Sequence, residues 1–85
     1  MGVHIPSHES GRVPIGAGRV MFYSGPSETC KEKGVFVLTG ETLDAYIEFK
    51  GFTMVLYINA KTGHDTTGWV ESSRLKETGY GIGPN

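Results

Sequence analysis

Apolar residues in this chain gather in short runs, and glycine, proline and polar residues separate the runs. Valine, isoleucine and aromatic residues are frequent in these runs, which is typical of β-strands. The pattern predicts strands at residues 19–23, 35–38, 43–49, 52–58 and 67–70. No segment has the length and the 3.6-residue period of a long helix, so we expect an all-β barrel or sandwich.

The run at residues 43–49 alternates most regularly between apolar and polar positions. Lys50-Gly51 supplies a short hairpin turn to the next run, and residues 59–65 supply a longer polar loop. Residues 71–75 suit a single helical or 3-10 turn. Strict alternation predicts that one face of the 43–49 strand carries Leu43, Ala45, Ile47 and Phe49, and that the other carries Asp44, Tyr46 and Glu48.

The two ends of the chain lack this patterning. Residues 1–18 have no regular period and include Pro6 and Pro14, which predicts an irregular N-terminal arm. Residues 28–33 are mostly charged and predict a surface loop. The glycine-rich residues 78–85 predict a C-terminal tail, which leaves residues 19–77 as the barrel domain.

Composition limits the function classes. The chain has 85 residues, enough for one domain, and a net charge of −1. Without a basic stripe we expect no nucleic-acid binding, and without a long apolar run we expect no membrane span. The N-terminus lacks the apolar stretch of a signal peptide. Cys30 is the only cysteine, which excludes an internal disulfide and favours a buried thiol over an exposed one or an intermolecular bridge.

No residue pattern indicates catalysis, a cofactor or a metal. His4 and His8 are four residues apart, but no third ligand of a suitable type lies near them in the sequence. Cys30 with His64 is the one candidate nucleophile and base, and nothing in the sequence places the two side chains together. We therefore predict a non-enzymatic protein, and the alternative from another class is a small enzyme that uses Cys30.

Several short motifs resemble those of the bacterial SH3-like domain. They are Gly25-Pro26-Ser27, Gly40, Gly51-Phe52, where the family usually has Gly-Trp, and Gly68-Trp69-Val70 followed by Ser72-Ser73 and Leu75. The resemblance covers residues 19–76. It implies a small five-stranded, partly open barrel. It also implies a periplasmic or other extracytoplasmic location and the binding of peptidoglycan or peptides.

Two sets of residues are candidates for binding. In SH3-like barrels, aromatic residues beside the loops commonly line a ligand groove, and aromatic rings suit extended ligands. This predicts a groove made of Tyr23, Tyr46, Phe52, Tyr57 and Trp69. The alternative is that many of these rings only pack in the core.

The second set follows from strand register. Val37, Leu43, Ala45, Val55 and Val70 are enough to fill a small barrel. The family pattern then places an apolar patch on the outer wall, which usually marks an interface. This patch consists of Phe36, Leu38, Met54 and Leu56. Its expected cover is the N-terminal arm, through Val3, Ile5, Val13 or Ile15, or else a second protein or a second copy.

These observations lead to one expected function and its alternatives. We expect a binding module that recognises a protein or peptide, in the manner of an immunity or inhibitor protein. The first alternative is a periplasmic module that binds peptidoglycan in the cell wall.

Overall fold

A computed structural model of the chain describes residues 2–59 and 61–80. Within these residues the protein consists of strands and short 3-10 turns, with no α-helix. The 3-10 turns are η1 (Ser7–Glu9), η2 (Glu28–Cys30) and η3 (Ser72–Arg74). The strands are β1 (Val3–His4), β2 (Gly11–Pro14), β3 (Val20–Tyr23), β4 (Lys31–Val37), β5 (Leu43–Phe49), β6 (Phe52–Ile58), β7 (Asp65–Glu71) and β8 (Leu75–Glu77).

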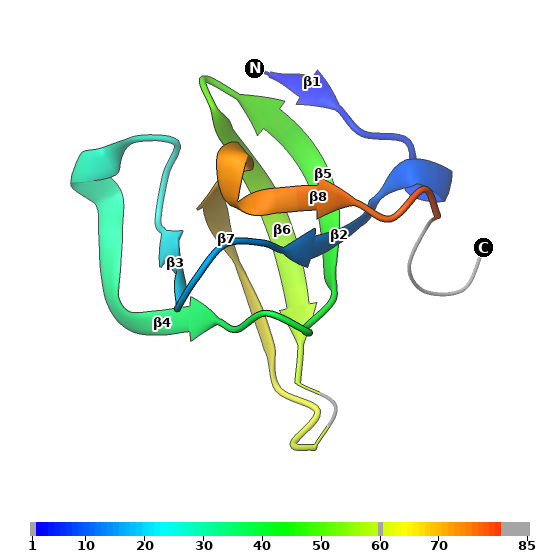
Figure 1. Ribbon diagram of the computed structural model, residues 1–85. Helices are drawn as coiled ribbons and strands as arrows, with labels where there is room; N and C mark the ends of the chain where they lie inside the picture. Colours follow the sequence, from blue (N-terminus) through cyan, green and yellow to red (C-terminus); the bar gives the residue numbers. More distant parts are fainter. Residues whose placement is uncertain (1, 60, 81–85) are drawn as a thin grey trace.

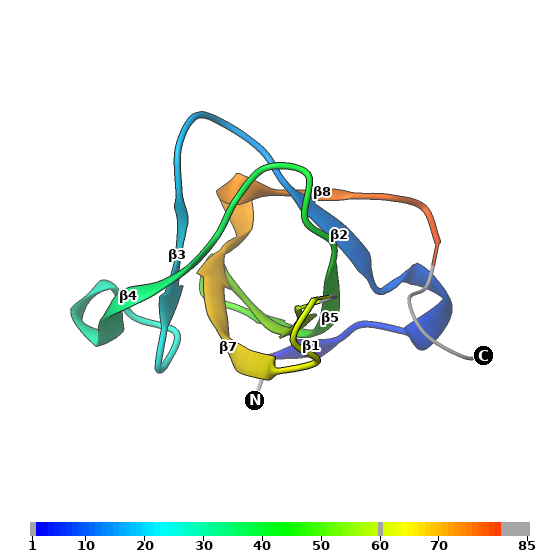
Figure 2. The same ribbon diagram turned by 90° about the horizontal axis from the view of Figure 1, so that it is seen from below.

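The strands form one antiparallel sheet in the order β4-β3-β7-β6-β5-β2-β8, with β1 paired to β5. The sheet curls strongly, so that its strands surround a central space in the view from below (Figure 2). The predicted all-β class is therefore confirmed. The sheet is a half-barrel of eight strands, where five strands were expected.

The β5–β6 hairpin lies at the centre of the fold and has the predicted bounds. Its turn residues both adopt positive φ, 51° at Lys50 and 82° at Gly51, which the tightest hairpin turns require. On its other side β6 pairs with the whole of β7, from Phe52 opposite Glu71 to Ile58 opposite Asp65. The predicted turn after β7 is also present, as η3.

Two parts of the N-terminal segment, β1 and β2, belong to the sheet, so the predicted irregular arm is wrong at residues 3–4 and 11–14 (Figure 1). β2 lies between β5 and β8 and pairs with both. Ser10 accepts a hydrogen bond from the Ala45 amide, and the Gly11 amide donates to Tyr80. The predicted surface loop at residues 28–33 is likewise replaced by η2 and the start of β4. Of the predicted tail, residues 81–85 lie outside the described residues.

The inside of the curl holds the main hydrophobic core. Its buried members are at most 3% exposed, and all five residues predicted to fill the barrel are among them. Packing is tight beside Gly68, where an added Cβ would lie 2.8 Å from Cδ2 of Phe22. The buried core consists of Val20, Phe22, Val37, Leu43, Ala45, Val55 and Val70.

A β-bulge in β5 changes which residues face this core. The register of β5 against β6 shifts between Ala45 and Ile47. A bulge inserts one unpaired residue, so the side chains beyond it switch faces. Leu43 and Ala45 face the inner core, whereas Ile47 and Phe49 pack with a second cluster. The predicted single apolar face of residues 43–49 is therefore wrong, because strict alternation assumes an uninterrupted strand.

Candidate functional site

A second apolar cluster lies on the opposite side of the sheet from the inner core. Four neighbouring strands build it, since Tyr23 of β3 pairs with Trp69, Trp69 with Met54, and Met54 with Ile47. We call this set the outer cluster. Its buried members are Tyr23, Phe52 and Trp69, and the half-buried residues packed against them are Met21, Cys30, Ile47, Phe49 and Met54.

Three of the five residues predicted to line a groove meet in the outer cluster. Tyr23 and Phe52 form an edge-to-face pair with ring centroids 5.0 Å apart. Tyr23 is 2% exposed, Phe52 7% and Trp69 8%, so these rings mainly bury one another. Tyr57 packs against the inner core instead, and Tyr46 is exposed on β5. A ligand groove in this region stays a prediction.

Three of the four residues of the predicted outer patch lie on the same side of the sheet as the outer cluster. Met54 belongs to the outer cluster, and Phe36 lies opposite Met21 across β3 and β4. Leu56 is half-buried and alternates with Val55 and Tyr57, which both face the inner core. Leu38 is 48% exposed, follows the end of β4 and belongs to neither cluster. We call the outer cluster together with Phe36 and Leu56 the outer face.

The N-terminal residues that were expected to cover this face lie elsewhere. Ile5 packs against the inner core. Val3 is 70% exposed and Ile15 is 39% exposed. Val13 lies in β2, between β5 and β8, and is not part of the outer cluster. None of these four residues belongs to the outer cluster, and the N-terminal segment approaches it only at β1, where Gly2 and His4 lie beside Ile47.

Cations lie over three aromatic rings on this side of the sheet. The Arg19 guanidinium is 4.5 Å from the centroid of the Phe36 ring. Lys31 Nζ is 5.8 Å from the ring of Tyr23, and Lys50 Nζ is 5.3 Å from that of Phe49. Such contacts contribute roughly 0.5–1 kcal/mol at exposed sites, so they orient the cations over the apolar surface.

Carboxylates beside the tyrosine hydroxyls influence their ionisation. The Tyr23 hydroxyl donates to Glu71 Oε1 at 3.1 Å. Burial raises the pKa of Tyr23 above its ordinary value, and the bond and charge of Glu71 raise it further. Burial and Asp44 likewise raise the pKa of Tyr46. For Tyr57 it is mainly the carboxylate of Glu41 that raises the pKa.

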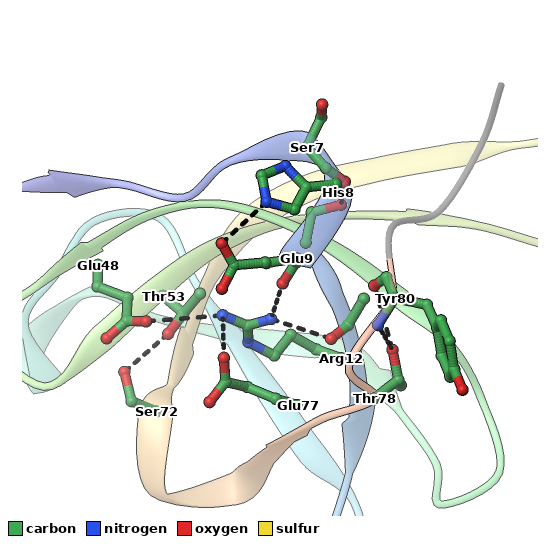
Figure 3. A network of polar contacts seen from close by, with 12 residues as sticks. Ser7, His8, Glu9, Arg12, Glu48, Thr53, Ser72, Glu77, Thr78 and Tyr80 are labelled. Carbon is green, nitrogen blue, oxygen red and sulfur yellow. Dashed lines mark hydrogen bonds and ion pairs between the residues drawn. The ribbon is translucent and has the colours of Figure 1, made fainter. Parts of the chain in front are cut away.

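A polar network around Arg12 is the main feature that the sequence did not indicate (Figure 3). The Arg12 side chain is only 5% exposed. Its Nη1 donates to the carbonyl oxygens of Glu9 at 2.6 Å and Gly11 at 3.0 Å. Its Nη2 lies 3.7 Å from carboxylate oxygens of both Glu48 and Glu77. These contacts tie β2 to η1, β5 and β8, which is a structural role.

The residues considered for catalysis or metal binding are dispersed. Cys30 is half-buried against the outer cluster, whereas His64 is exposed in the loop between β6 and β7. His4 lies in β1, and His8 lies in η1, where its Nε2 is 3.2 Å from Glu9. Across residues 2–59 and 61–80, no three histidine, cysteine or acidic residues are grouped as a metal site would need. The same part of the chain contains no helix long and apolar enough to cross a membrane.

Comparisons of the chain with protein-family models, with curated proteins and with solved structures gave no match. The functional argument therefore depends on the surface itself.

Proposed function

We propose that this chain is a non-enzymatic binding module of the SH3-like type whose outer face recognises another protein. The order of its motifs supports the SH3-like assignment. Gly25-Pro26-Ser27 follows β3, Gly68-Trp69-Val70 lies in β7, and η3 follows β7 directly.

One observation carries the function: the outer face extends over the five strands β3 to β7, and Val3, Ile5, Val13 and Ile15 are not part of it. The inner core already fills the curl of the sheet, so the second cluster is surplus to the barrel. Phe36, Met54 and Leu56 remain partly exposed. Apolar surfaces of this extent on small proteins commonly mark interfaces with other proteins.

The chemistry of the face favours a protein over a carbohydrate polymer. Methionine and aromatic side chains are enriched in the centres of protein interfaces. The face supplies the half-buried residues Met21, Met54 and Phe36. A partner that buries aliphatic or aromatic side chains would match it. A bound toxin or enzyme, as for an immunity or inhibitor protein, is one such partner.

A capture experiment with matched variants tests this function. Immobilised wild-type protein is expected to retain a defined protein from an extract of the source cells. Leu56→Glu places a charge on the outer face and should abolish that retention. Lys76→Glu, on the exposed strand β8, is the control and should retain the same protein. Equal retention by all three proteins would contradict the proposal.

Two further measurements distinguish this function from wall binding and from catalysis. Retention on purified peptidoglycan with no captured protein would favour the wall-binding function. A module that works by binding alone should keep its captured protein after Cys30→Ala. Loss of a measurable activity in that variant, with capture intact, would favour an enzyme.

A further inference from the structure

We propose that an unpaired stretch of β7, residues Asp65–Thr67, binds an extended peptide of another protein by strand addition. We call this stretch the β7 edge. The site goes beyond the proposed function, because its backbone hydrogen bonds do not require the outer face. Strand pairing on the two sides of β7 leads to this site.

β7 is paired along its whole length on one side and at a single position on the other. β6 pairs with every residue from Asp65 to Glu71. On the opposite side, β3 pairs with β7 only where Tyr23 lies opposite Trp69. Within the described part of the chain, the β7 edge therefore has a neighbouring strand on one side alone.

Hydrogen bonding between β6 and β7 determines where the backbone groups of the β7 edge point. The Asn59 amide donates to the His64 carbonyl at 2.9 Å, at the loop end of this pair. In an antiparallel pair, hydrogen-bonded positions alternate with positions whose N–H and C=O groups point away from the partner strand. Counting from His64, Thr66 bonds to β6. Asp65 and Thr67 therefore direct their N–H and C=O groups away from β6.

The turn after β3 leaves these groups without a partner strand. A longer β3 would place Gly25 opposite Thr67. The Gly25 carbonyl instead accepts a hydrogen bond from the Ser27 amide at 2.8 Å, inside the turn. Among the described residues, no backbone hydrogen bond reaches Asp65 or Thr67 from the β3 side. Both residues are exposed, so two donors and two acceptors face the solvent there.

The strands at the two ends of the sheet are less suited to adding a strand. β4 begins with three charged residues, Lys31–Lys33, and Gly34 interrupts it with a φ of 74°. β8 has only three residues, and two of them are charged. Charges and irregular backbone at an edge discourage pairing with another chain. The β7 edge has two threonines, which favour strands, and a single charge.

The four free backbone groups specify the occupant. Asp65 and Thr67 each offer one donor and one acceptor, and alternate residues of a strand are about 6.7 Å apart. An extended peptide presents donor and acceptor pairs at this repeat, whereas a glycan does not. A second copy fits poorly. Antiparallel pairing of two β7 edges would bring the 59–64 loop of each copy against β3 of the other, because β3 already occupies the position beside Trp69.

Neighbouring side chains indicate a suitable peptide sequence. Asp65 is exposed and belongs to none of the ion pairs among the described residues. Opposite charges and β-branched residues form favourable pairs across antiparallel strands. A peptide that continues the line of β3 runs antiparallel to β7. The segment Thr-Val-Lys then places threonine opposite Thr67 and lysine opposite Asp65.

A titration with the capped peptide acetyl-Thr-Val-Lys-Gly-amide tests the site. NMR should show a shift of the Thr67 amide resonance and slower exchange of its hydrogen with solvent. Four hydrogen bonds of ordinary net strength correspond to a Kd on the order of 1 mM. An unchanged Thr67 amide at about 10 mM peptide, roughly tenfold above that Kd, would overturn the proposal.

Two methylated peptides distinguish backbone pairing from side-chain recognition. Methylation of the threonine nitrogen removes the N–H that donates to the Thr67 carbonyl and should weaken binding at least about fivefold. The valine N–H points away from β7, so its methylation should leave the Kd within about twofold of the parent value. Equal affinity of both methylated peptides would exclude strand addition.

Matched variants of the protein give the reciprocal measurement. Thr67→Pro removes an amide that points away from β6, at an edge position that tolerates proline. It should weaken peptide binding at least about fivefold. Thr67→Val keeps the amide and should bind like the wild type. Circular dichroism checks both folds, and the methylated peptides decide the question if Thr67→Pro does not fold.

Hydrogen exchange in the free protein tests whether the edge is open. The Thr67 amide should exchange at least about tenfold faster than the Thr66 amide, which bonds to β6. Protection of Thr67 at every protein concentration would mean that the chain itself covers the edge. Protection that rises with concentration would identify a second copy as the occupant. Either result overturns the peptide site. Protein capture by Thr67→Pro would leave the proposed function standing, and a wild type that binds the peptide but captures nothing would leave the β7 edge standing.

Discussion

Arg12 shows how a single charged residue can hold distant segments together. Its guanidinium is almost fully buried, and it donates to two backbone carbonyls near the N-terminus. The carboxylates of Glu48 and Glu77 lie 3.7 Å from Arg12 Nη2 and balance its charge. Both glutamate side chains are more than half exposed, so they keep much of their hydration. A buried charge arranged in this way costs much to disrupt, because its removal leaves the buried polar groups around it without a partner.

Replacing Arg12 with methionine should therefore destabilise the fold. Methionine keeps much of the side-chain volume and removes both hydrogen bonds and the charge. We expect the free energy of unfolding to fall by about 2–4 kcal/mol. Urea denaturation measures this change. Lys76→Met, at an exposed position, is the control and should stay within about 0.5 kcal/mol of the wild type. Equal midpoints for the two variants would contradict the structural role of Arg12.

Tyr23 leads to a prediction for alkaline pH. Burial and Glu71 raise the pKa of Tyr23 in the folded protein above the ordinary value of 10.0. The folded state then holds this proton more tightly than the unfolded state does. Its contribution to stability is complete below pH 10 and is lost as the pH rises through the folded pKa.

The free energy of unfolding should accordingly decline above pH 10, and the decline should be shallower in Tyr23→Phe. Urea midpoints between about pH 8 and pH 11 give the slope. Tyr80→Phe changes a tyrosine that is 77% exposed and serves as the control. An identical slope in wild type and Tyr23→Phe would show that Tyr23 does not cause the decline.

At the scale of elements, the sequence predicts best where local signals agree. Residues 52–58 combine a continuous β-prone run with the Lys50-Gly51 turn, and β6 begins and ends where expected. β5 has equally correct bounds, but its bulge moves Ile47 to the outer face. A bulge has no local signature in this sequence, because the pairing with β6 decides its position.

β2 was missed for a different reason. Its residues include Gly11 and Pro14, which do not favour a strand locally. Its backbone pairs instead with segments more than thirty residues away, at Asp44 and Glu77. The spacing of apolar residues along the chain does not reveal such long-range pairing. For this reason the N-terminal segment resembled an arm in the sequence and is part of the half-barrel in the structure.

Two truncations test this difference between arm and strand. Removing residues 1–4 deletes only β1, whose two residues are exposed, and should leave a folded protein. Removing residues 1–14 deletes β2 as well, exposes the facing edges of β5 and β8 and eliminates the Arg12 contacts. We expect the longer truncation to lack a cooperative unfolding transition in circular dichroism. A folded protein without residues 1–14 would contradict the position of β2 in the sheet.

At the scale of the molecule, the sheet carries apolar clusters on both sides. The inner core was predictable because five valine, leucine and alanine positions agree with strand parity. The outer face was predicted only in part. Met54 and Phe36 lie on the outer side, where the family pattern placed them, whereas Ile47 and Phe49 reach this side only through the bulge. Separate predictions of a groove and a patch thus describe one surface.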